Sequence, residues 1–368
     1  MSVVHDSPDL AAIRDALFAA DRVVMTTHLR PDGDAIGSEI GLARALMAAG
    51  KQVLILNADP VPRTLDWLVE EQPVGLVQTY ESGSLDQARA VAEADALVVL
   101  DANVKHRLGP VGDLFAQASR PVLLVDHHPD PERWYTRSCV RTDAAAAAEI
   151  VYDLVAGRDP ALISRAVATA LYVGIMTDTG SFRYGATTPR THAIVSDLLE
   201  RGDLRPEPIH VALFDGRSLA SLRLLSAALA TIQTHYDGRF ATIVVTQNTI
   251  RQTGAFFDEA EGLVNYALSL DGVVAAAIFL ELPSGVKLSF RSKGDCPING
   301  WANHFGGGGH ANASGAYVAG ATVKRLLTEV VDSAPAHVMA APGTTEPAAD
   351  GDLTDADLAL LAQFQGRL

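Results

Sequence analysis

The stretch ALVVLDANVKHRLGPVGDLFAQASRPVLLVDHHPD occupies residues 96–130. It contains two short apolar runs, ALVVLD at 96–101 and PVLLVD at 121–126, and each run ends on an aspartate. Apolar runs of about four to six residues are typical of strands that are buried on both faces, as in parallel sheets covered by helices. The stretch therefore predicts two strands of a parallel sheet.

The same alternation of strands and helices continues on both sides of this stretch. Further strands are predicted at RVVMTTH (22–28) and QVLILN (52–57). Helices are predicted at 10–20, 35–50, 86–94, 144–157, 164–178 and 188–202. We therefore expect an α/β first domain at residues 1–202, built on a doubly wound, mainly parallel sheet.

The second half of the chain has a different pattern. The polar segment DLRPEPIH (203–210) carries two prolines, and it opens a predicted linker at 203–216. The elements predicted after it are a helix near 217–234 and strands at 240–247, 272–282 and 285–293. Because these strands are closely spaced, we expect a smaller α/β domain at 217–334, with the active-site cleft between the two domains. Residues 335–368 are predicted to be an acidic tail rich in alanine and proline.

Composition limits the classes of function. The chain has 368 residues, a formal net charge of -15, and lysine only at positions 51, 105, 287, 293 and 324. A protein that tracks long duplex nucleic acid usually has a basic face, so we expect a small anionic substrate bound at a local positive site. No apolar run reaches membrane-spanning length, which predicts a cytoplasmic protein with no membrane partner. Two cysteines make neither a disulfide framework nor a zinc cluster.

Acidic and histidine side chains follow several of the predicted strands. His28, Asp32 and Asp34 lie in HLRPDGDAIGS after the first strand, and Asp101 ends a later one. The sequence Asp126-His127-His128 ends the strand after that. Because ligands bind beyond the carboxyl ends of the strands in such sheets, we expect these side chains to meet at one edge. Asp178, in GIMTDTGSF, is a fourth candidate.

This donor set predicts a pair of metal ions. Mixed imidazole and carboxylate ligands suit Mn²⁺, and iron or zinc less selectively, rather than calcium. One acid would have to bridge two cations, and Asp101 is the natural choice because it ends the middle strand of the three. Two metals can activate a water and clamp a phosphate oxygen. The pattern therefore predicts metal-assisted hydrolysis of a phosphoester.

The order of these motifs resembles that of the DHH phosphoesterase superfamily. HLRPDGDAIGS, Asp101, DHH and TDTGSF (177–182) match its N-terminal motifs. FRSK, followed by HFGGGGHANASG at 304–315, is similar to the glycine-rich signature of the DHH-associated C-terminal domain. The resemblance covers residues 8–330. Within the superfamily, the chain most resembles the branch of the bacterial bifunctional oligoribonucleases and pAp phosphatases, or nanoRNases. Relatives often carry serine or threonine where this chain has AAAAAE (144–149).

The resemblance implies a role for each motif residue. His28 and Asp32 would bind the first metal. Asp34, His127 and Asp178 would bind the second metal, and Asp101 would bridge the two. His128 would contact the scissile phosphate, and Asp126 would orient its neighbours.

Substrate binding is predicted mainly in the second domain. A side-chain-free GGGG run at 306–309 can bring backbone N–H groups close to an anion, although such a run can also be a flexible linker. The predicted substrate-binding residues are Arg291, Ser292, Lys293, Gly307, Gly308, Gly309, His310 and, in the first domain, Arg107. Arg291 and His310 would bind a terminal phosphate or stack on a base. For Lys293 and Arg107 a role as an ordinary surface charge stays open.

These observations predict a two-metal enzyme that hydrolyses short RNA to 5′-mononucleotides and removes the 3′-phosphate of pAp. Substrates of about two to five nucleotides fit the net charge, because short chains need few phosphate contacts. One alternative is hydrolysis of a cyclic dinucleotide such as c-di-AMP, or of the linear dinucleotide pApA, at the same metal site. Another is a nucleotide-binding regulatory module with a lapsed site, against which the complete ligand set argues. Apolar helices such as 188–202 could serve a homodimer.

Overall fold

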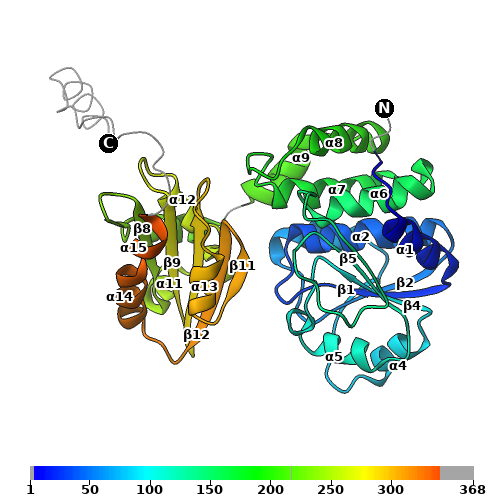
Figure 1. Cartoon of the computed structure of the whole chain (residues 1–368), viewed down its shortest axis with the longest axis horizontal. Helices are drawn as coiled ribbons and strands as arrows, with labels where there is room; N and C mark the ends of the chain where they lie inside the picture. The colour runs from blue at the N-terminus through cyan, green and yellow to red at the C-terminus, as the bar shows by residue number, and fades with distance from the viewer. Residues whose placement is uncertain (1–3, 217, 340–368) are drawn as a thin grey trace. The chain divides into compact units, whose positions relative to one another are not determined.

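The computed structural model describes residues 4–216 and 218–339. The chain divides into two compact units, Met1–Gly216 and Arg217–Leu368 (Figure 1). Within the described ranges, no helix is both long enough and apolar enough to cross a lipid bilayer.

The first unit contains the predicted parallel sheet. Its six strands have the order β3-β2-β1-β4-β5-β6, and every neighbouring pair is parallel. The strands are β1 (Arg22–Thr26), β2 (Gln52–Asn57), β3 (Val77–Thr79), β4 (Ala96–Leu100), β5 (Val122–Asp126) and β6 (Arg137–Val140). The edge strands β3 and β6 were not expected, because each is too short to show an apolar run.

Helices cover both faces of this sheet. The main ones are α1 (Pro8–Ala19), α2 (Gly33–Ala48), α4 (Leu85–Glu93), α5 (Pro110–Gln117), α6 (Ala147–Arg158), α7 (Arg165–Asp178) and α8 (Pro189–Gly202). Figure 1 shows α4 and α5 on one face and α1 and α2 on the other, with α7 and α8 stacked beyond α2. Val98 of β4 points into one apolar core and Val99 into the other. Burial on both faces explains why these strands are apolar throughout.

Close packing of α2 against α7 brings two distant motifs together. A side chain at Gly37 of α2 would overlap the carbonyl oxygen of Ala170 and approach the backbone of Gly174, both on α7. Only glycine allows this approach of two helix backbones. It places Asp34, at the start of α2, close to the end of α7, where Asp178 lies.

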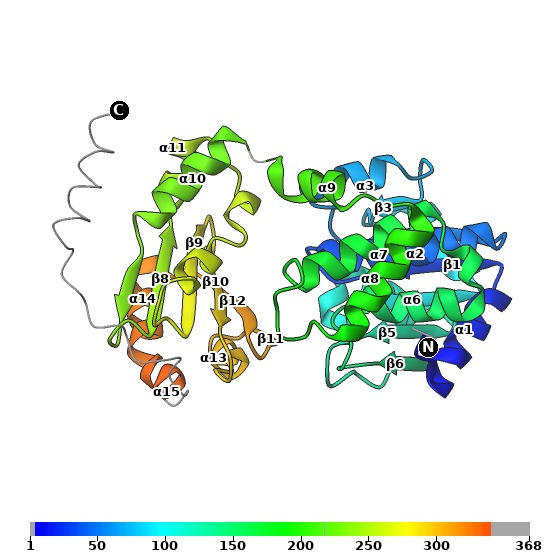
Figure 2. The same ribbon diagram turned by 90° about the horizontal axis from the view of Figure 1, so that it is seen from above.

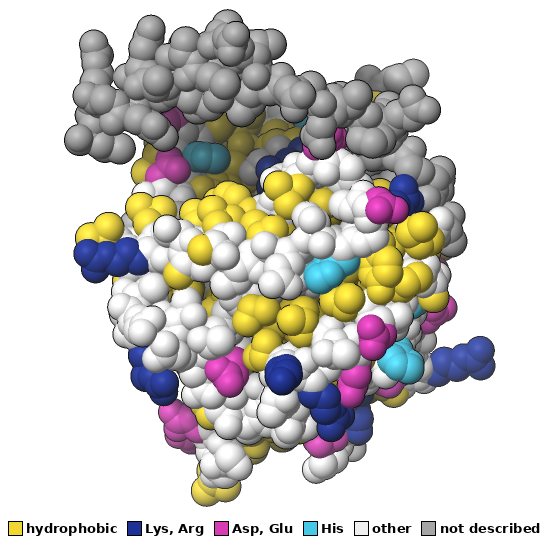
Figure 3. All heavy atoms as spheres, turned by 90° about the vertical axis from the view of Figure 1, so that its left-hand side faces the viewer, with side chains coloured by type: hydrophobic (Ala, Val, Ile, Leu, Met, Phe, Trp, Pro, Cys, Tyr) yellow, Lys and Arg dark blue, Asp and Glu magenta, His cyan; other side chains and the backbone are white. Residues whose placement is uncertain are grey.

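The second unit contains a mixed sheet with the strand order β11-β12-β10-β9-β8-β7. Its strands are β7 (Gln233–His235), β8 (Phe240–Val245), β9 (Ala275–Leu282), β10 (Gly285–Ser292), β11 (Gly308–His310) and β12 (Ala313–Ala319). Its helices include α10 (Leu219–Leu229), α11 (Gln247–Thr253) and α12 (Val264–Leu268), which pack on one core, and α13 (Asn299–His304) and α14 (Val323–Ser333), which pack on another. Figure 2 shows this unit from a second direction, and Figure 3 shows a face on which apolar side chains lie among charged side chains of both signs.

The predicted linker at 203–216 differs from the structure. Pro206–His210 forms α9, and Val211–Asp215 continues it as a π-helical turn within the first unit. Pro206 is the first residue of α9, where a missing N–H costs nothing. The buried side chain of Ile209 packs on the core of the first unit. Prolines in this segment therefore start a helix rather than break one.

The predicted tail also begins differently. Pro335–Val338 forms a short helix, α15, and the side chain of Val338 is fully buried. The Arg239 guanidinium donates to the carbonyl oxygen of Val338 through Nε at 3.0 Å and through a terminal nitrogen at 2.8 Å. Residues 335–338 are thus part of the second unit. The rest of the predicted tail, residues 340–368, lies outside the described residues.

Candidate metal centre

The site lies at the carboxyl end of the parallel sheet in the first unit. In the sheet, β4 lies between β1 and β5, so Asp101 emerges between the segments that carry His28 and His127. The register pairs Thr26 with Val99, and Leu100 with Val125, so these strands end at nearly the same level. The structure therefore brings the three predicted strand ends together.

Asp101 lies between two histidines. Its Oδ2 is 3.4 Å from Nε2 of His28, and its Oδ1 is 3.4 Å from Nε2 of His127. The residue is 2% exposed, and Oδ1 accepts no hydrogen bond from the described residues. Its backbone also has a φ of +56°, which is costly for a non-glycine residue. A buried carboxylate oxygen without a hydrogen bond is rare and fits a group that binds an ion.

The described residues contain three overlapping groups of His and Asp ligand atoms around this carboxylate; the largest comprises Asp101, Asp126, His127 and His128, and the other two have three residues each. One three-residue group comprises His28, Asp32 and Asp101, the other comprises Asp34, His127 and Asp178, and within each group the ligand atoms lie within 4.8 Å of one another. Nε2 of His28 is 3.9 Å from Oδ2 of Asp32. Nε2 of His127 is 4.0 Å from Oδ2 of Asp34 and 3.6 Å from Oδ2 of Asp178. These nitrogen and oxygen donors fit divalent cations.

Backbone carbonyl groups orient both imidazoles. Nδ1 of His28 lies 2.9 Å from the carbonyl oxygen of Leu29, and Nδ1 of His127 lies 3.2 Å from that of Ala144. A carbonyl can only accept, so Nδ1 carries the hydrogen in each ring. In the neutral ring Nε2 then has its lone pair directed at the carboxylates. This arrangement is usual for histidines that ligate metals.

Asp126 organises the loop after β5. Its fully buried Oδ1 accepts from the backbone nitrogens of His127 at 2.7 Å and His128 at 3.1 Å, and from Nδ1 of His128 at 2.8 Å. Asn103, which the sequence reasoning did not single out, donates to the carbonyl oxygen of His128 at 3.1 Å. Its position two residues after Asp101 was the only available signal. The loop is thus held from both sides.

Asp34 is held by the start of α6. The backbone nitrogens of Ala147 and Ala148 donate to its Oδ2 at 2.6 Å and to its Oδ1 at 2.9 Å. The N-cap residue of α6 is Ala146, which has no side chain that could cap the helix. Asp34 takes over that function and places its charge at the positive end of the helix. The alanine run at 144–149 therefore still supports the site, through its backbone.

Burial and crowding perturb the ionisation of these groups. Burial is the main cause that raises the pKa of Asp34 well above its usual value and the pKa of Asp178 to about 7. For Asp101 burial is outweighed by the neighbouring histidines, and its pKa is well below the usual range. Burial by itself would lower the histidine values, but Asp101 overrides it and raises the pKa of His28 to about 9 and that of His127 to about 11. Divalent cations would relieve the repulsion among the acids.

Arg107 lies near this edge. Its carbonyl oxygen accepts a hydrogen bond of 2.6 Å from the backbone of Leu29, which follows His28. Its positive charge acts to lower the pKa of His28, against the larger effect of Asp101. Its guanidinium forms no ion pair with the described residues, so it remains available to an anion.

The predicted substrate-binding residues of the second unit form two sets: Arg291 and His310, which lie on strands β10 and β11 of the sheet, and Ser292 and Lys293, whose side chains form hydrogen bonds within the unit. Arg291 of β10 pairs with Ala313 of β12, which in turn pairs with His310 of β11. Arg291 and the backbone of His310 are therefore at one level of the sheet; the side chain of His310 lies outside the described part. The hydroxyl of Ser292 donates to the carbonyl oxygen of Cys296 and accepts from Asn312. Ser292 thus has its hydrogen bonds inside the unit.

Lys293 is also engaged within the second unit. Its ammonium donates to the carbonyl oxygen of Leu270 at 3.2 Å.

The glycine run is partly a strand rather than a loop. Gly308 and Gly309 belong to β11 and pair with Gly315 and Ser314 of β12. A side chain at Gly307 would overlap the carbonyl oxygen of Gly315, and Gly309 has a φ of +135°. Close approach of two backbones and an unusual φ both require glycine, which is a structural reason for the run beside the predicted binding role.

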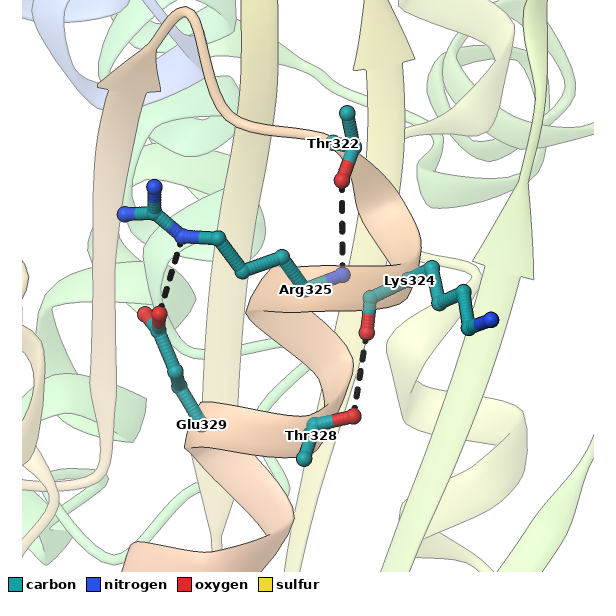
Figure 4. A pocket seen from close by; sticks show the side chains of 5 residues that line it. All are labelled: Thr322, Lys324, Arg325, Thr328 and Glu329. Atoms are coloured by element: carbon teal, nitrogen blue, oxygen red, sulfur yellow. Dashed lines mark hydrogen bonds and ion pairs between the residues drawn. The ribbon is translucent and has the colours of Figure 1, made fainter.

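A surface depression on α14 does not have the character of this site. It is lined by Thr322, Lys324, Arg325, Thr328 and Glu329 (Figure 4). Arg325 and Glu329 form an exposed ion pair of 2.9 Å one helical turn apart. Such pairs are common on helix surfaces and contribute little.

Comparison with known proteins supports one family. The model described as "DHH family, N-terminal domain" matches residues 22–175, and the model described as "DHHA1 domain" matches residues 238–334. The chain is 31% identical to the bifunctional oligoribonuclease and PAP phosphatase NrnA of Thermus thermophilus, over 84% of this chain and 88% of that protein. A crystal structure of an exopolyphosphatase-related protein from Bacteroides fragilis superposes with a TM-score of 0.84 and 27% identity, over 91% of this chain and 98% of that one.

A more distant match has a different name. The cyclic-di-AMP phosphodiesterase PdeA of Listeria monocytogenes is 22% identical over 89% of this chain, which spans 49% of that protein.

Proposed function

This chain belongs to the DHH family, and we propose that it hydrolyses short oligoribonucleotides to 5′-mononucleotides and removes the 3′-phosphate of pAp. It is a metal-dependent phosphoric ester hydrolase. The observation that carries the proposal is the position of Asp101, whose two oxygens each face a different histidine where two ligand groups meet. Relatives that carry both activities in their names match most of the chain.

The proposed cofactor is a pair of divalent cations, with Mn²⁺ as the expected metal. His28 and Asp32 would hold one ion, Asp34, His127 and Asp178 the other, and Asp101 would bridge them. When bound, the cations supply charge that polarises the phosphoryl oxygens and activates water. The buried Asp101 Oδ1, which accepts no hydrogen bond from the described residues, is the observation that favours such ions.

His128 is proposed to contact the substrate, and Asp126 to hold the ring of His128 in position. The hydrogen bond between Nδ1 of His128 and Oδ1 of Asp126 fixes the orientation of the imidazole ring. We assign to the imidazolium form of His128, in which Nδ1 donates to Asp126 and Nε2 also carries a hydrogen, the donation of a hydrogen bond from Nε2 to a phosphoryl oxygen. Such preorganised donors stabilise charge that develops in the transition state.

Recognition of the far end of the nucleotide is assigned to the second unit. Arg291, together with the backbone N–H groups near Gly308 and the imidazole of His310, would bind a terminal phosphate or a base. On the first unit, Arg107 would contact phosphate. Ser292 and Lys293 are retained as weaker candidates because intra-unit hydrogen bonds already engage both. We propose that the enzyme is cytoplasmic and that these small nucleotides are its substrates. Formation of a homodimer remains a prediction.

Product analysis by chromatography tests this function. Purified protein with Mn²⁺ is given pAp, a 5′-phosphorylated RNA dinucleotide and cyclic di-AMP in parallel, with Asp101→Ala as the control. Turnover of the first two substrates, absent in the control, is the expected result. Preference for cyclic di-AMP would assign the chain to the activity named for the Listeria relative. No turnover of any substrate would favour a nucleotide-binding module with a lapsed site.

A further inference from the structure

A cluster of four charged residues lies behind the metal site. Glu149 and Asp153 belong to α6, and Arg141 and Arg190 approach them from the end of β6 and from the first turn of α8. Glu149 is 2% exposed and Asp153 is fully buried. Arg190 donates to Oε2 of Glu149 at 2.9 Å and to both carboxylate oxygens of Asp153 at 2.6 Å. Arg141 donates to Asp153 at 2.7 Å.

A gain in stability alone does not explain the presence of this cluster, which we call the Arg190 cluster. A buried ion pair is often no more stabilising than apolar side chains of the same volume, because both charges lose their hydration. Removing one partner is nevertheless costly, because an unpaired charge is left inside the protein. The best supported use of such pairs is to fix how two elements lie against each other. The question is therefore what the cluster holds in place.

The geometry of Arg190 answers that question. Glu149 and Asp153 are one helical turn apart on α6, and a single guanidinium of α8 binds both. Because the planar guanidinium of Arg190 binds two acids one turn apart, it opposes both rotation of α6 about its axis and movement of α6 along that axis. Arg141 clamps the same Asp153 from another element. The position of α6 is thus set by charge pairs on two sides.

The start of α6 is also the part that holds Asp34. Glu149 is the third residue of the helix, directly after Ala147 and Ala148, whose N–H groups bind the Asp34 carboxylate. These hydrogen bonds require the helix end to face Asp34 at the right angle. A small rotation of α6 would move both donors. The carboxylate would then be free to turn away from His127 and Asp178.

We propose that Arg190 is a positioning residue for the metal held by Asp34, His127 and Asp178. It acts through Glu149 and the first turn of α6, and it does not touch the ligands. This inference rests on the proposed function, because it takes the two metal positions from it. Residues that support metal ligands from behind typically change metal affinity by about 10- to 100-fold when they are replaced.

Calorimetric titration with Mn²⁺ tests this role. Wild type is expected to bind two ions, and Arg190→Met is expected to weaken one of the two binding steps by about 10- to 100-fold and leave the other unchanged. The matched control is Arg89→Met, because Arg89 also pairs with an acid, Glu93, at 2.7 Å, on the exposed surface of α4. Titrations are run at a temperature where circular dichroism shows each variant to be folded.

Two single-site backgrounds identify the affected ion. In His28→Ala, which would leave mainly the second position, Arg190→Met should remove most of the remaining affinity. In His127→Ala, which would leave mainly the first position, Arg190→Met should have no effect. General destabilisation would lower both affinities alike, so this contrast separates a positioning role from a structural one.

A second variant keeps the proposal testable if Arg190→Met does not fold. Glu149→Gln retains an acceptor for Arg190 but removes the charge, and it should weaken the same binding step to a smaller degree. The inference is overturned if wild type binds two ions and both Arg190→Met and Glu149→Gln bind them equally well. A wild-type protein that binds no pair of ions would instead overturn the proposed function, and this inference with it.

Discussion

The carboxylate of Asp34 accepts a hydrogen bond of 2.6 Å from the backbone nitrogen of Ala147, which lies 113 residues further along the chain. One acidic side chain thus caps a helix and serves as a candidate metal ligand. The helix needs the charge because its own N-cap residue is an alanine. The metal ligand needs the helix because two backbone N–H groups fix the orientation of the buried carboxylate.

We expect Asp34→Asn to lose one of the two metal ions. An amide can accept from only one of the two backbone N–H groups, and its own NH₂ group would face the other. Bound Mn²⁺ measured by atomic absorption should fall from two ions to one per chain, and turnover of pAp should fall by at least about 100-fold. The control is Asp203→Asn, at the end of α8. Retention of both ions would show that Asp34 is not a ligand.

Asp126→Asn should separate catalysis from metal binding. Asp126 bonds through Oδ1 to His128 and to the backbone of the loop; it belongs to the four-residue ligand group with Asp101, His127 and His128, and to neither three-residue group. Loss of its charge should leave the His128 ring poorly oriented and lower kcat by about 10- to 100-fold. The Mn²⁺ stoichiometry should stay at the wild-type value. A variant that lost metal but kept its kcat when Mn²⁺ was in excess would contradict this role.

Mn²⁺ binding should release protons at pH 7. The pKa values of about 9 for His28 and about 11 for His127 mean that both rings carry an extra proton in the metal-free chain. A metal ligand must offer a neutral nitrogen, so the two imidazoles must lose these protons. Calorimetry in two buffers of different ionisation enthalpy gives the number released. His28→Gln should release about one proton fewer; an enthalpy independent of buffer would show that neither ring carries an extra proton before the metal binds.

Glu39→Gln should stabilise the metal-free protein at high pH. Glu39 is fully buried, burial is the main cause that raises its pKa from 4.5 to about 8, and its Oε2 accepts from Asn57 at 2.7 Å. The folded state therefore holds a proton that the unfolded state releases, and the stability contribution of Glu39 falls as pH rises from about 4.5 to about 8. Glutamine keeps the acceptor and cannot ionise.

Urea unfolding in the presence of a chelator measures this effect. At pH 9 the Glu39→Gln variant should be more stable than wild type by a few kcal/mol, roughly, and at pH 5 the difference should be small. The matched control is Glu70→Gln, because the side chain of Glu70 is exposed. Parallel curves for wild type and Glu39→Gln across this range would show that Glu39 is not buried as a neutral acid.

Much of the molecule could be predicted from short-range patterns. The apolar runs that end on Asp101 and Asp126 identified buried parallel strands, and the rule that ligands lie beyond the carboxyl ends of such strands identified the candidate metal edge. Both inferences depend on alternation and spacing within a few residues. The same short-range reasoning wrongly predicted a linker at 203–216, because prolines occur both in loops and in the first turn of a helix.

The sequence by itself determined which donor atoms reach one edge of the sheet, because strand direction and strand ends are properties of local segments. Only the tertiary structure decided how those donors are held: Asp34 by Ala147 and Ala148, and α6 by Arg190 of α8. These contacts join segments 41 to 114 residues apart. They depend on how closely α2, α6, α7 and α8 pack, and no periodicity in the chain records the distance between two helices.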